Sequence, residues 1–522
     1  MSVSGISDSE AAALAYHEAT KHSFESVRSR RHFFDWANQP HPFKVFDANL
    51  PRISLPQGQS PVGMSALDAI GGVPRDPPVV LDLGALSRIL SYGAGVIRKM
   101  SVGGGKAVYF RTYACAGALY PVEVYVVSAA LPGLTAGVYH FDPLHRVLTA
   151  LREGDHQAYL VRAAAGEPAL SAASTILVLT GMPWRTTWKY TERGYRHLWW
   201  DSGMILANLL ALAGSAGIAA RVICGFVDSE VETLLGLDAR AEFPLGLLSL
   251  GRGGQVPASG DPPPSASFPF RPLSGRQIEY PTILEVNDAG RLRDASEVAA
   301  WRARGFPEPV APTMLGGPTV PVERALPVSD SLEAVIRRRG SARIFDREPV
   351  PAGVAATIWE RATRGSATDL APDGSRPVTL YLIANALEGL APGAYVVEEG
   401  GLRVLAEGSL RREAGYLCLE QALGADAAAT FFLATDLARI LPRLGARGYR
   451  VGQLEAGIVA GKIYLGAYAY RLGATGLTFY DDDVTTFFSP HAGDPAGART
   501  GAHTCMLVVA MGRTSRRLLP LA

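Results

Sequence analysis

The order of apolar and polar positions predicts a chain of alternating strands and helices. Residues 122–128 and 174–180 are short runs rich in β-branched and aromatic side chains, as in buried strands. Residues 198–214 form a longer apolar run, which indicates a long helix. This mixture predicts an α+β fold in which helices cover a mixed or antiparallel sheet.

The second half of the chain carries a comparable set of patterns. Ser329, Asp330 and Ser331 are suitable caps for a helix that starts near residue 331. Further helices are predicted around 354–363 and 454–470, and strands at 379–384, 430–435 and 506–511. The two halves therefore have the same kinds of element.

Matching landmarks show that this likeness is a repeat. Arg-Gly-Tyr-Arg occurs at 193–196 and again at 447–450, an offset of 447 − 193 = 254. The strand entry at 121–125 is echoed at 377–381, an offset of 377 − 121 = 256. Such a long period is not that of a solenoid. It predicts a duplicated domain whose copies pack about a pseudo-twofold axis, as in a fused homodimer.

The breaker residues predict four segments. Residues 1–75 are interpreted as an amino-terminal extension that clasps the core, and residues 76–252 as the first core module. A Pro-rich linker at 253–328 is long enough to cross from the first module to the second, which spans 329–522. A site built between the modules would then exist twice, and its copies could diverge.

Composition and charge exclude some functions. Fifty Lys and Arg residues balance 49 Asp and Glu residues, so the formal net charge of +1 argues against nucleic acid or an anionic membrane as partner. The amino terminus lacks the features of a signal peptide, and the cysteines form no ligand cluster. We expect a cytoplasmic protein without a metal. The cysteines are Cys115, Cys224, Cys418 and Cys505.

One segment resembles a membrane span. Residues 203–226 are almost entirely apolar, but they are rich in Gly and Ala, and the matching segment 457–479 contains Lys462 and Arg471. A charge in mid-span costs several kcal/mol in lipid. We therefore expect a buried helix at the interface of the two modules, because small residues let two helices approach closely.

An arginine cluster in the second half could bind an anion. Arg337, Arg338, Arg339 and Arg343 lie within seven residues at the end of a predicted helix, together with Ser341. The planar guanidinium fork suits phosphate oxygens. A solvated basic run is the competing interpretation.

Two features of the first half are candidates for chemistry. The loop after Arg111 contains Cys115-Ala116-Gly117-Ala118-Leu119, whose small side chains would let the backbone contact a flat ligand. On composition alone, an ordinary strand-entry loop explains it more simply. Lys189 and Tyr190 place an amine beside a phenol, and burial would lower the pKa of such a lysine toward that of a base. An isolated Lys-Tyr pair is more often part of the surface.

In combination these motifs resemble the SagB-type (SagB/ThcOx, McbC-like) dehydrogenases, a branch of the FMN-dependent nitroreductase superfamily. The resemblance rests on residues 16–23, 111–125, 189–190, 193–203, 337–345 and 476–483. It implies two tandem nitroreductase-like domains that form an intrachain pseudo-dimer, with FMN at their interface. It also implies oxidation of azoline rings to azoles in a ribosomally made peptide, next to a cyclodehydratase partner. In that chemistry Lys189 and Tyr190 would assist proton removal while hydride passes to the flavin.

The halves depart from the family pattern in opposite ways. The first half keeps the loop and the Lys-Tyr pair, but around 67–75 it has lost the arginines. The second half keeps the arginines, but 373–377 replaces the loop and no Lys-Tyr pair precedes Arg447. This predicts one surviving site, with FMN against the loop near Lys189. For the phosphate the candidates are Arg111, Arg193 and Arg196, or, reaching across the interface, Arg337, Arg339, Ser341 and Arg343.

Other functions stay open at this stage. The chain could reduce a nitro compound, quinone or enone with NAD(P)H, or it could be a non-catalytic flavin-binding scaffold in a peptide-modifying complex. The sequence does not identify the peptide or small-molecule substrate, the direction of electron transfer, the number of flavins or further homo-oligomerisation.

Overall fold

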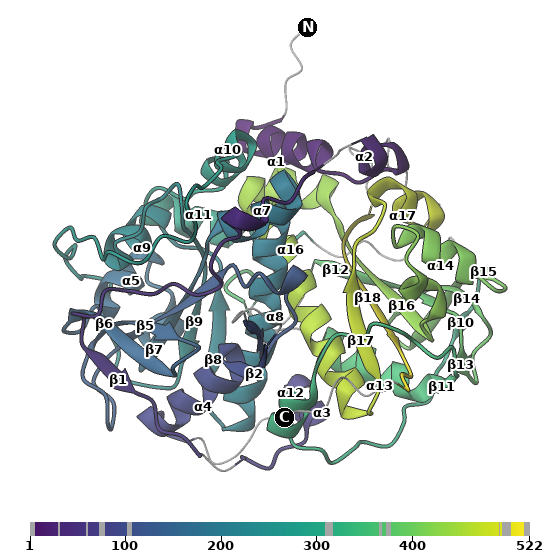
Figure 1. The fold of residues 1–522 in the computed structure, drawn as a ribbon, viewed down its shortest axis with the longest axis horizontal. Coiled ribbons are helices and arrows are strands. Elements are labelled where there is room, and N and C mark those ends of the chain that lie inside the picture. The colour runs from purple at the N-terminus through teal and green to yellow at the C-terminus, as the bar shows by residue number, and fades with distance from the viewer. Residues whose placement is uncertain are drawn as a thin grey trace, which may run out of the picture.

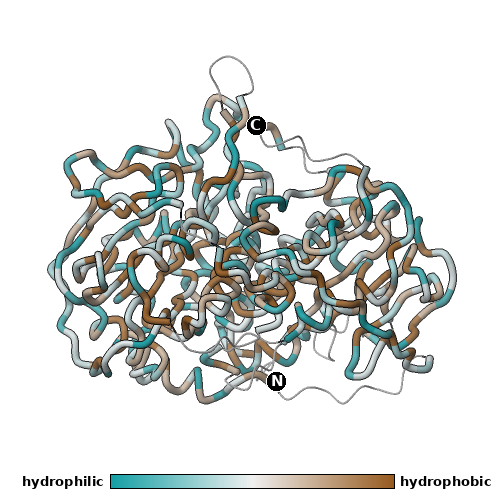
Figure 2. The backbone as a smooth tube through the Cα atoms, turned by 90° about the horizontal axis from the view of Figure 1, so that it is seen from below, coloured by the Kyte–Doolittle hydropathy of each residue, from teal (hydrophilic) through white to brown (hydrophobic). Residues whose placement is uncertain are grey.

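The computed structural model contains two similar lobes with long helices between them (Figure 1). It describes residues 6–29, 32–58, 61–72, 79–101, 107–307, 317–364, 368–371, 377–489, 491–492 and 503–515. Hydrophobic segments gather toward the centre of the molecule (Figure 2). The core therefore includes the region where the lobes meet.

The first lobe is built on a seven-stranded antiparallel sheet of order β1-β6-β5-β4-β7-β9-β8. Its strands are β1 (Arg52–Ser54), β4 (Val122–Ser128), β5 (Gly137–Asp142), β6 (Val147–Glu153), β7 (Thr175–Gly181), β8 (Ala220–Ile223) and β9 (Phe243–Leu250). All residues of β4, β7 and β9 are buried, because helices cover both faces of the sheet. Their apolar sequences follow from this double burial.

The second lobe repeats this topology in the order β10-β15-β14-β12-β16-β18-β17. Its strands are β10 (Thr319–Val320), β12 (Val378–Ala384), β14 (Gly393–Glu398), β15 (Gly401–Glu407), β16 (Ala429–Asp436), β17 (Gly473–Leu477) and β18 (His503–Gly512). Each strand has a counterpart at the same place in the first sheet. The predicted duplication, the α+β class and the pseudo-dimer are thus confirmed.

Two helices cross at the centre of the molecule: α8 (Gly194–Ser215) and α16 (Leu437–Ala469). A Cβ atom added to Gly203 would lie 2.5 Å from the Cα of Gly457. Only glycine allows this backbone approach, which explains the small residues that the sequence places there. No helix among the described residues is long and apolar enough to cross a membrane.

The predicted helix at 454–470 is only the second part of α16. The helix begins at Leu437 and includes a break at Gly445, whose φ of 61° is left-handed. This break lies directly before the second Arg-Gly-Tyr-Arg motif.

The remaining helices pack around α8 and α16 or against the sheets. They are α3 (Ala66–Ile70), α4 (Leu83–Ala94), α5 (Gln157–Ala163), α6 (Pro168–Ser171), α7 (Pro183–Tyr190), α9 (Asp228–Leu235), α12 (Leu332–Arg338), α13 (Ala352–Thr363), α14 (Arg411–Leu417), α15 (Ala422–Asp426) and α17 (Asp481–Phe487). Short elements are the 3-10 turns η1 (Trp36–Asn38), η2 (Ala116–Ala118) and η3 (Thr191–Arg193), and the paired strands β2 (Val96–Ser101) with β3 (Ala107–Arg111) and β11 (Val350–Pro351) with β13 (Leu387–Glu388).

The extension and the linker pack against both lobes. In the extension, α1 (Asp8–Ala19) is followed by α2 (Phe24–Ser29); Tyr16 donates to the Glu192 carbonyl at 2.7 Å and His17 lies 3.2 Å from the Tyr449 hydroxyl. The linker forms α10 (Pro281–Ala289) and α11 (Ala295–Arg304), where Trp301 is buried. These two helices were not predicted, because the Pro-rich start of the linker obscured them.

Candidate functional site

The small-residue loop of the first half turns its backbone toward the Lys-Tyr pair. Gly117 has a φ of 62°, and Ala118 and Tyr120 are also left-handed, with φ of 54° and 49°. A Cβ atom on Gly117 would lie 3.0 Å from the Tyr190 hydroxyl and 3.3 Å from Lys189 Nζ. Left-handed backbone at non-glycine residues is strained and is typical of functional sites. Glycine therefore keeps the space between the loop and the pair open.

Burial changes the proton affinity of the Lys-Tyr pair. Partial burial, and then the positive charge of Arg343, lower the pKa of Lys189. Burial raises the pKa of Tyr190 far above its usual value. Desolvation disfavours the charged form of each group. Lys189 is thus closer to a neutral base, whereas Tyr190 keeps its proton.

The buried His197 stacks against one face of the Tyr190 ring. The rings of Tyr190 and His197 are stacked, with centroids 4.1 Å apart and an angle of 18° between their planes. His197 is 3% exposed. Burial, and then the charge of Arg193, lower the pKa of His197 well below its usual value. A neutral imidazole therefore fixes the plane of the Tyr190 ring.

A buried carboxyl group holds the loop in place. Asp201 Oδ1 accepts from the Ala116 N–H at 3.2 Å, and Oδ2 accepts from the Cys115 thiol at 3.1 Å. Cys115 in turn accepts from the Tyr120 N–H at 3.1 Å. Burial raises the pKa of Asp201 from 3.8 to about 7.

Sequence reasoning missed both His197 and Asp201. They are polar positions four residues apart in a largely apolar helix, so they share one face of α8. This spacing could have identified them as side chains that point toward a site.

The arginine cluster of the second half reaches this loop. Arg339 is buried, and its guanidinium group donates to the carbonyls of Arg111 at 3.0 Å and Thr112 at 3.1 Å. Arg343 is exposed, and its charge acts on Lys189 and Tyr190. The two motifs, far apart in sequence, thus meet across the interface of the halves.

The other members of the cluster have separate contacts. Arg338 donates to Asp330 at 2.6 Å, and Arg337 contacts the Tyr92 hydroxyl of the first half. The Ser341 hydroxyl lies 3.5 Å from that of Tyr464. Arg343 and Ser341 are therefore the members best placed to meet an anion, with Arg337 at the edge.

The three first-half arginines are engaged elsewhere. Arg193 and Arg196 form ion pairs of 2.8 and 2.7 Å with Asp481 of the second half. Arg111 is 2% exposed and donates to the Pro42 carbonyl at 2.8 Å. All three guanidinium groups are buried and bind acceptors of the protein itself. We therefore propose that the other candidates, in the second-half cluster, bind the phosphate.

The second Arg-Gly-Tyr-Arg motif has the same role at the position related by the pseudo-twofold axis. Arg447 and Arg450 pair with Asp228 of the first half at 2.6 and 3.3 Å. Each motif thus binds an aspartate at the start of a helix in the opposite lobe. The repeat that marks the duplication is a pair of buried cross-links between the halves.

Near the pseudo-symmetric place, residues of both halves and of the linker contact one another. The Asp369 carboxylate accepts from the Cys224 and Gly225 N–H groups, both at 2.8 Å, and Arg302 lies 3.4 Å from it. A Cβ on Gly225 would touch the Trp301 ring at 3.1 Å. The predicted loop at 373–377 and arginine-poor segment at 67–75 lie partly outside the described residues, which omit 372–376 and 73–78.

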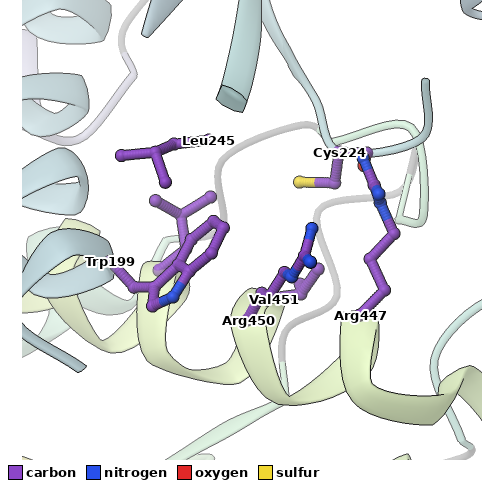
Figure 3. A pocket seen from close by; sticks show the side chains of 7 residues that line it. Trp199, Cys224, Leu245, Arg447, Arg450 and Val451 are labelled. Carbon is purple, nitrogen blue, oxygen red and sulfur yellow. The ribbon is translucent and has the colours of Figure 1, made fainter. Parts of the chain in front are cut away.

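A small cavity lies beneath this second place (Figure 3), with room for about one water molecule. It is lined by Trp199, Cys224, Leu245, Arg447, Arg450, Val451 and Leu454. The offset of 254 places Val451 where the first half has His197, and Arg443-Leu444 where it has Lys189-Tyr190. The cavity therefore has no equivalent of the Lys-Tyr pair.

The chain resembles known proteins in family, in sequence and in structure. The Nitroreductase family model matches residues 77–252 and 336–513. A solved structure of a nitroreductase-type protein from Anabaena variabilis superposes with a TM-score of 0.74 at 26% identity, covering 96% of this chain and 99% of that one. The double-lobed fold is thus shared along nearly the whole chain.

Three sequence relatives cover smaller regions. MJ1384 of Methanocaldococcus jannaschii, described as a nitroreductase, is 29% identical over 172 residues, 33% of this chain and 81% of its own. Microcin B17-processing protein McbC of Escherichia coli is 31% identical over 140 residues, 26% of this chain and 52% of its own. Trifolitoxin-processing protein TfxB of Rhizobium leguminosarum is 28% identical over 188 residues, 33% of this chain and 48% of its own. The chain spans about half the length of the two peptide-processing relatives.

Proposed function

The chain belongs to the nitroreductase family, and on that basis we propose that it is an FMN-dependent oxidoreductase with one working site per chain. The site combines the loop Cys115–Leu119 and the Lys189-Tyr190 pair of the first half with the arginine cluster of the second. The observation that carries the proposal is the contact of Arg339 with the carbonyls of Arg111 and Thr112. This contact joins the loop that we expect to bind the flat flavin ring to the arginine cluster that we expect to bind its phosphate.

The residues present fit a flavin phosphate ester. Exposed Gly117 leaves backbone open to a planar ring, and a side chain there would fill the space in front of Lys189. Exposed Arg343 and half-buried Ser341 offer a charged fork and a hydroxyl for the phosphate. Arg339 holds the cluster against the loop and would not itself bind the phosphate.

We further assign the reaction to azoline dehydrogenation in a modified peptide. Bound FMN would supply the hydride acceptor, with dioxygen as the final electron acceptor. Lys189, whose pKa is lowered by partial burial, accepts the proton that leaves the azoline ring carbon. Tyr190 keeps its proton and donates a hydrogen bond to the ring heteroatom, while His197 and Asp201 fix the positions of Tyr190 and the loop.

The printed names of two relatives support this substrate class. McbC and TfxB are named as proteins that process microcin B17 and trifolitoxin. Because the matches span about half of those proteins, the peptide substrate and a cyclodehydratase partner belong to the proposal. Reduction of a nitro compound, quinone or enone is the second candidate, since MJ1384 matches over most of its length under a nitroreductase name.

Stoichiometry and anaerobic reduction test the proposal together. After reconstitution with FMN we expect one flavin per chain, bleached by a thiazoline peptide, with a product lighter by two hydrogens. Rapid bleaching by NADPH without peptide would favour the reductase. Flavin that binds but is bleached neither by the peptide nor by NADPH would favour the flavin-binding scaffold, and two flavins with equal reduction rates would contradict the single site.

A further inference from the structure

An exposed aromatic surface lies beside the Lys-Tyr pair. Phe33, Phe34 and Trp36 of the extension are 83%, 41% and 68% exposed. We call these three residues the aromatic rim. Single exposed apolar side chains are ordinary, but several large rings together mark an interaction site.

The rim is fixed to the helix that carries the pair. Trp188 Nε1 donates to the Asp35 carbonyl at 2.9 Å, and His32 Nε2 lies 2.8 Å from the Trp188 carbonyl. The rings of Phe34 and Trp36 lie 5.6 and 5.3 Å from that of Trp188. Trp188 directly precedes Lys189, so the rim has a defined position next to the reacting groups.

The rim is continuous with the flavin loop through a buried apolar cluster. Trp188 packs there with Leu119 of the loop, and Tyr190 packs against its edge. Met182, Trp184 and Leu273 complete the cluster. Contacts between apolar side chains thus link the loop and Tyr190 to the exposed rings through the buried Trp188.

We propose that the aromatic rim binds apolar or aromatic side chains of an extended peptide, on residues that flank the ring presented to Lys189. Tryptophan and phenylalanine are enriched at the centres of binding surfaces. The occupant is the substrate, because Trp188 contacts the rim on one side and belongs to the cluster that packs against Tyr190 on the other, so a peptide chain bound at Lys189 would be within reach of the rim. The inference rests on the proposed function and adds a preference for the flanking sequence.

The test uses the FMN-loaded full chain and two peptides. Each carries a central thiazoline, flanked in one by two phenylalanines and in the other by two serines. The variants are Phe33→Ser with Trp36→Ser, and the control Phe24→Ser. Phe24 is matched because it is 46% exposed in the same extension but stacks with Arg28 rather than joining the rim.

Fluorescence anisotropy measures binding independently of turnover. We expect the rim variant to bind the phenylalanine peptide about tenfold more weakly, with affinity for the serine peptide and FMN content unchanged. Phe24→Ser should match the wild type with both peptides. Equal loss for the two peptides, or no loss, overturns the proposal.

Two further outcomes separate this inference from others. If sedimentation shows that the rim variant changes the oligomeric state while peptide affinity is constant, the rim binds a second copy of the chain and the proposal fails. If the rim governs affinity but the wild type oxidises no azoline, the rim stands and the proposed reaction fails. If the wild type oxidises the azoline and neither the rim variant nor the flanking residues change this oxidation, the proposed reaction stands and the role of the rim fails.

Discussion

Among the described residues, the two places where the halves could form a site differ in their contacts. At one, Arg339 of the second half binds the Arg111 and Thr112 carbonyls directly before the first-half loop, and the charge of Arg343 acts on Lys189. Near the other, Asp369 accepts from the N–H groups of Cys224 and Gly225, and Trp301 packs against Gly225. Along the sequence the losses look complementary, one in each half. Each place combines the loop of one half with the arginines of the other half. The arginines lost from the first half and the loop lost from the second half therefore belong to the same place, and the other place keeps all of its parts.

The helix residues next to the two places also differ, with larger side chains in the first half than in the second. The first half has His197 and Trp200 where the offset of 254 places Val451 and Leu454 in the second. The larger pair fills its space, and His197 stacks under Tyr190. The smaller pair lines the cavity. If the second place has no chemistry, as we propose, it needs only packing, which tolerates a small void more readily than the tyrosine that we propose as catalytic tolerates a loose support.

The largest expected difference is between Lys189 and its counterpart Arg443. Lys189→Ala should lower the rate of azole formation about 10²- to 10⁴-fold, the usual contribution of a general base. The flavin should stay bound. Single-turnover kinetics on the FMN-loaded protein measure this, with Arg443→Ala as control. Unchanged turnover in Lys189→Ala would remove the lysine from the mechanism.

The cross-half ion pairs should instead respond alike. Asp481→Asn and Asp228→Asn each leave two buried arginines without a carboxylate, which costs about 3–5 kcal/mol in free energy of unfolding. Urea denaturation measures both. A large loss for one variant and none for the other would show that the two cross-links are not equivalent.

Asp201 should give the first half its own pH dependence. Its pKa is raised from 3.8 to about 7 in the folded protein, so between those values the folded state binds more protons than the unfolded state. The free energy of unfolding should therefore fall as pH rises from about 4 to about 7, by up to a few kcal/mol. Asp201→Asn should flatten this part of the profile.

The control for that profile is Glu455→Gln, the corresponding position of the second half. Thermal unfolding at a series of pH values should show the wild-type fall in this variant. An Asp201→Asn profile that parallels the wild type would assign the fall to another group.

The smallest expected effect concerns the phosphate. Arg343→Gln should raise the Kd for FMN about tenfold, because one charge-assisted hydrogen bond is lost. Arg347→Gln is a matched control, since Arg347 is also exposed but pairs with Asp426. Flavin fluorescence quenching measures both. Equal affinities for Arg343→Gln and wild type would place the phosphate elsewhere in the cluster.

Local sequence determined the elements and the duplication. The β-branched run at 122–128 reflects a buried strand, and the small residues around Gly203 and Gly457 reflect two closely packed helices. Both features are visible as local patterns in the sequence. The loop, the Lys-Tyr pair and the arginine cluster were likewise visible as motifs. Helices α10 and α11 were missed because breakers dominate the start of their segment.

Only the tertiary structure decided which motifs share a site. Arg193 and Arg196 looked like phosphate ligands, yet they bind Asp481, nearly three hundred residues later in the chain. Arg339 crosses to carbonyls more than two hundred residues earlier. A guanidinium group binds whichever acceptor the fold brings within hydrogen-bond distance, and the packing of α8 on α16 sets that choice. The sequence therefore determined which chemical groups are present, and the packing of the two lobes determined which of these groups contact one another.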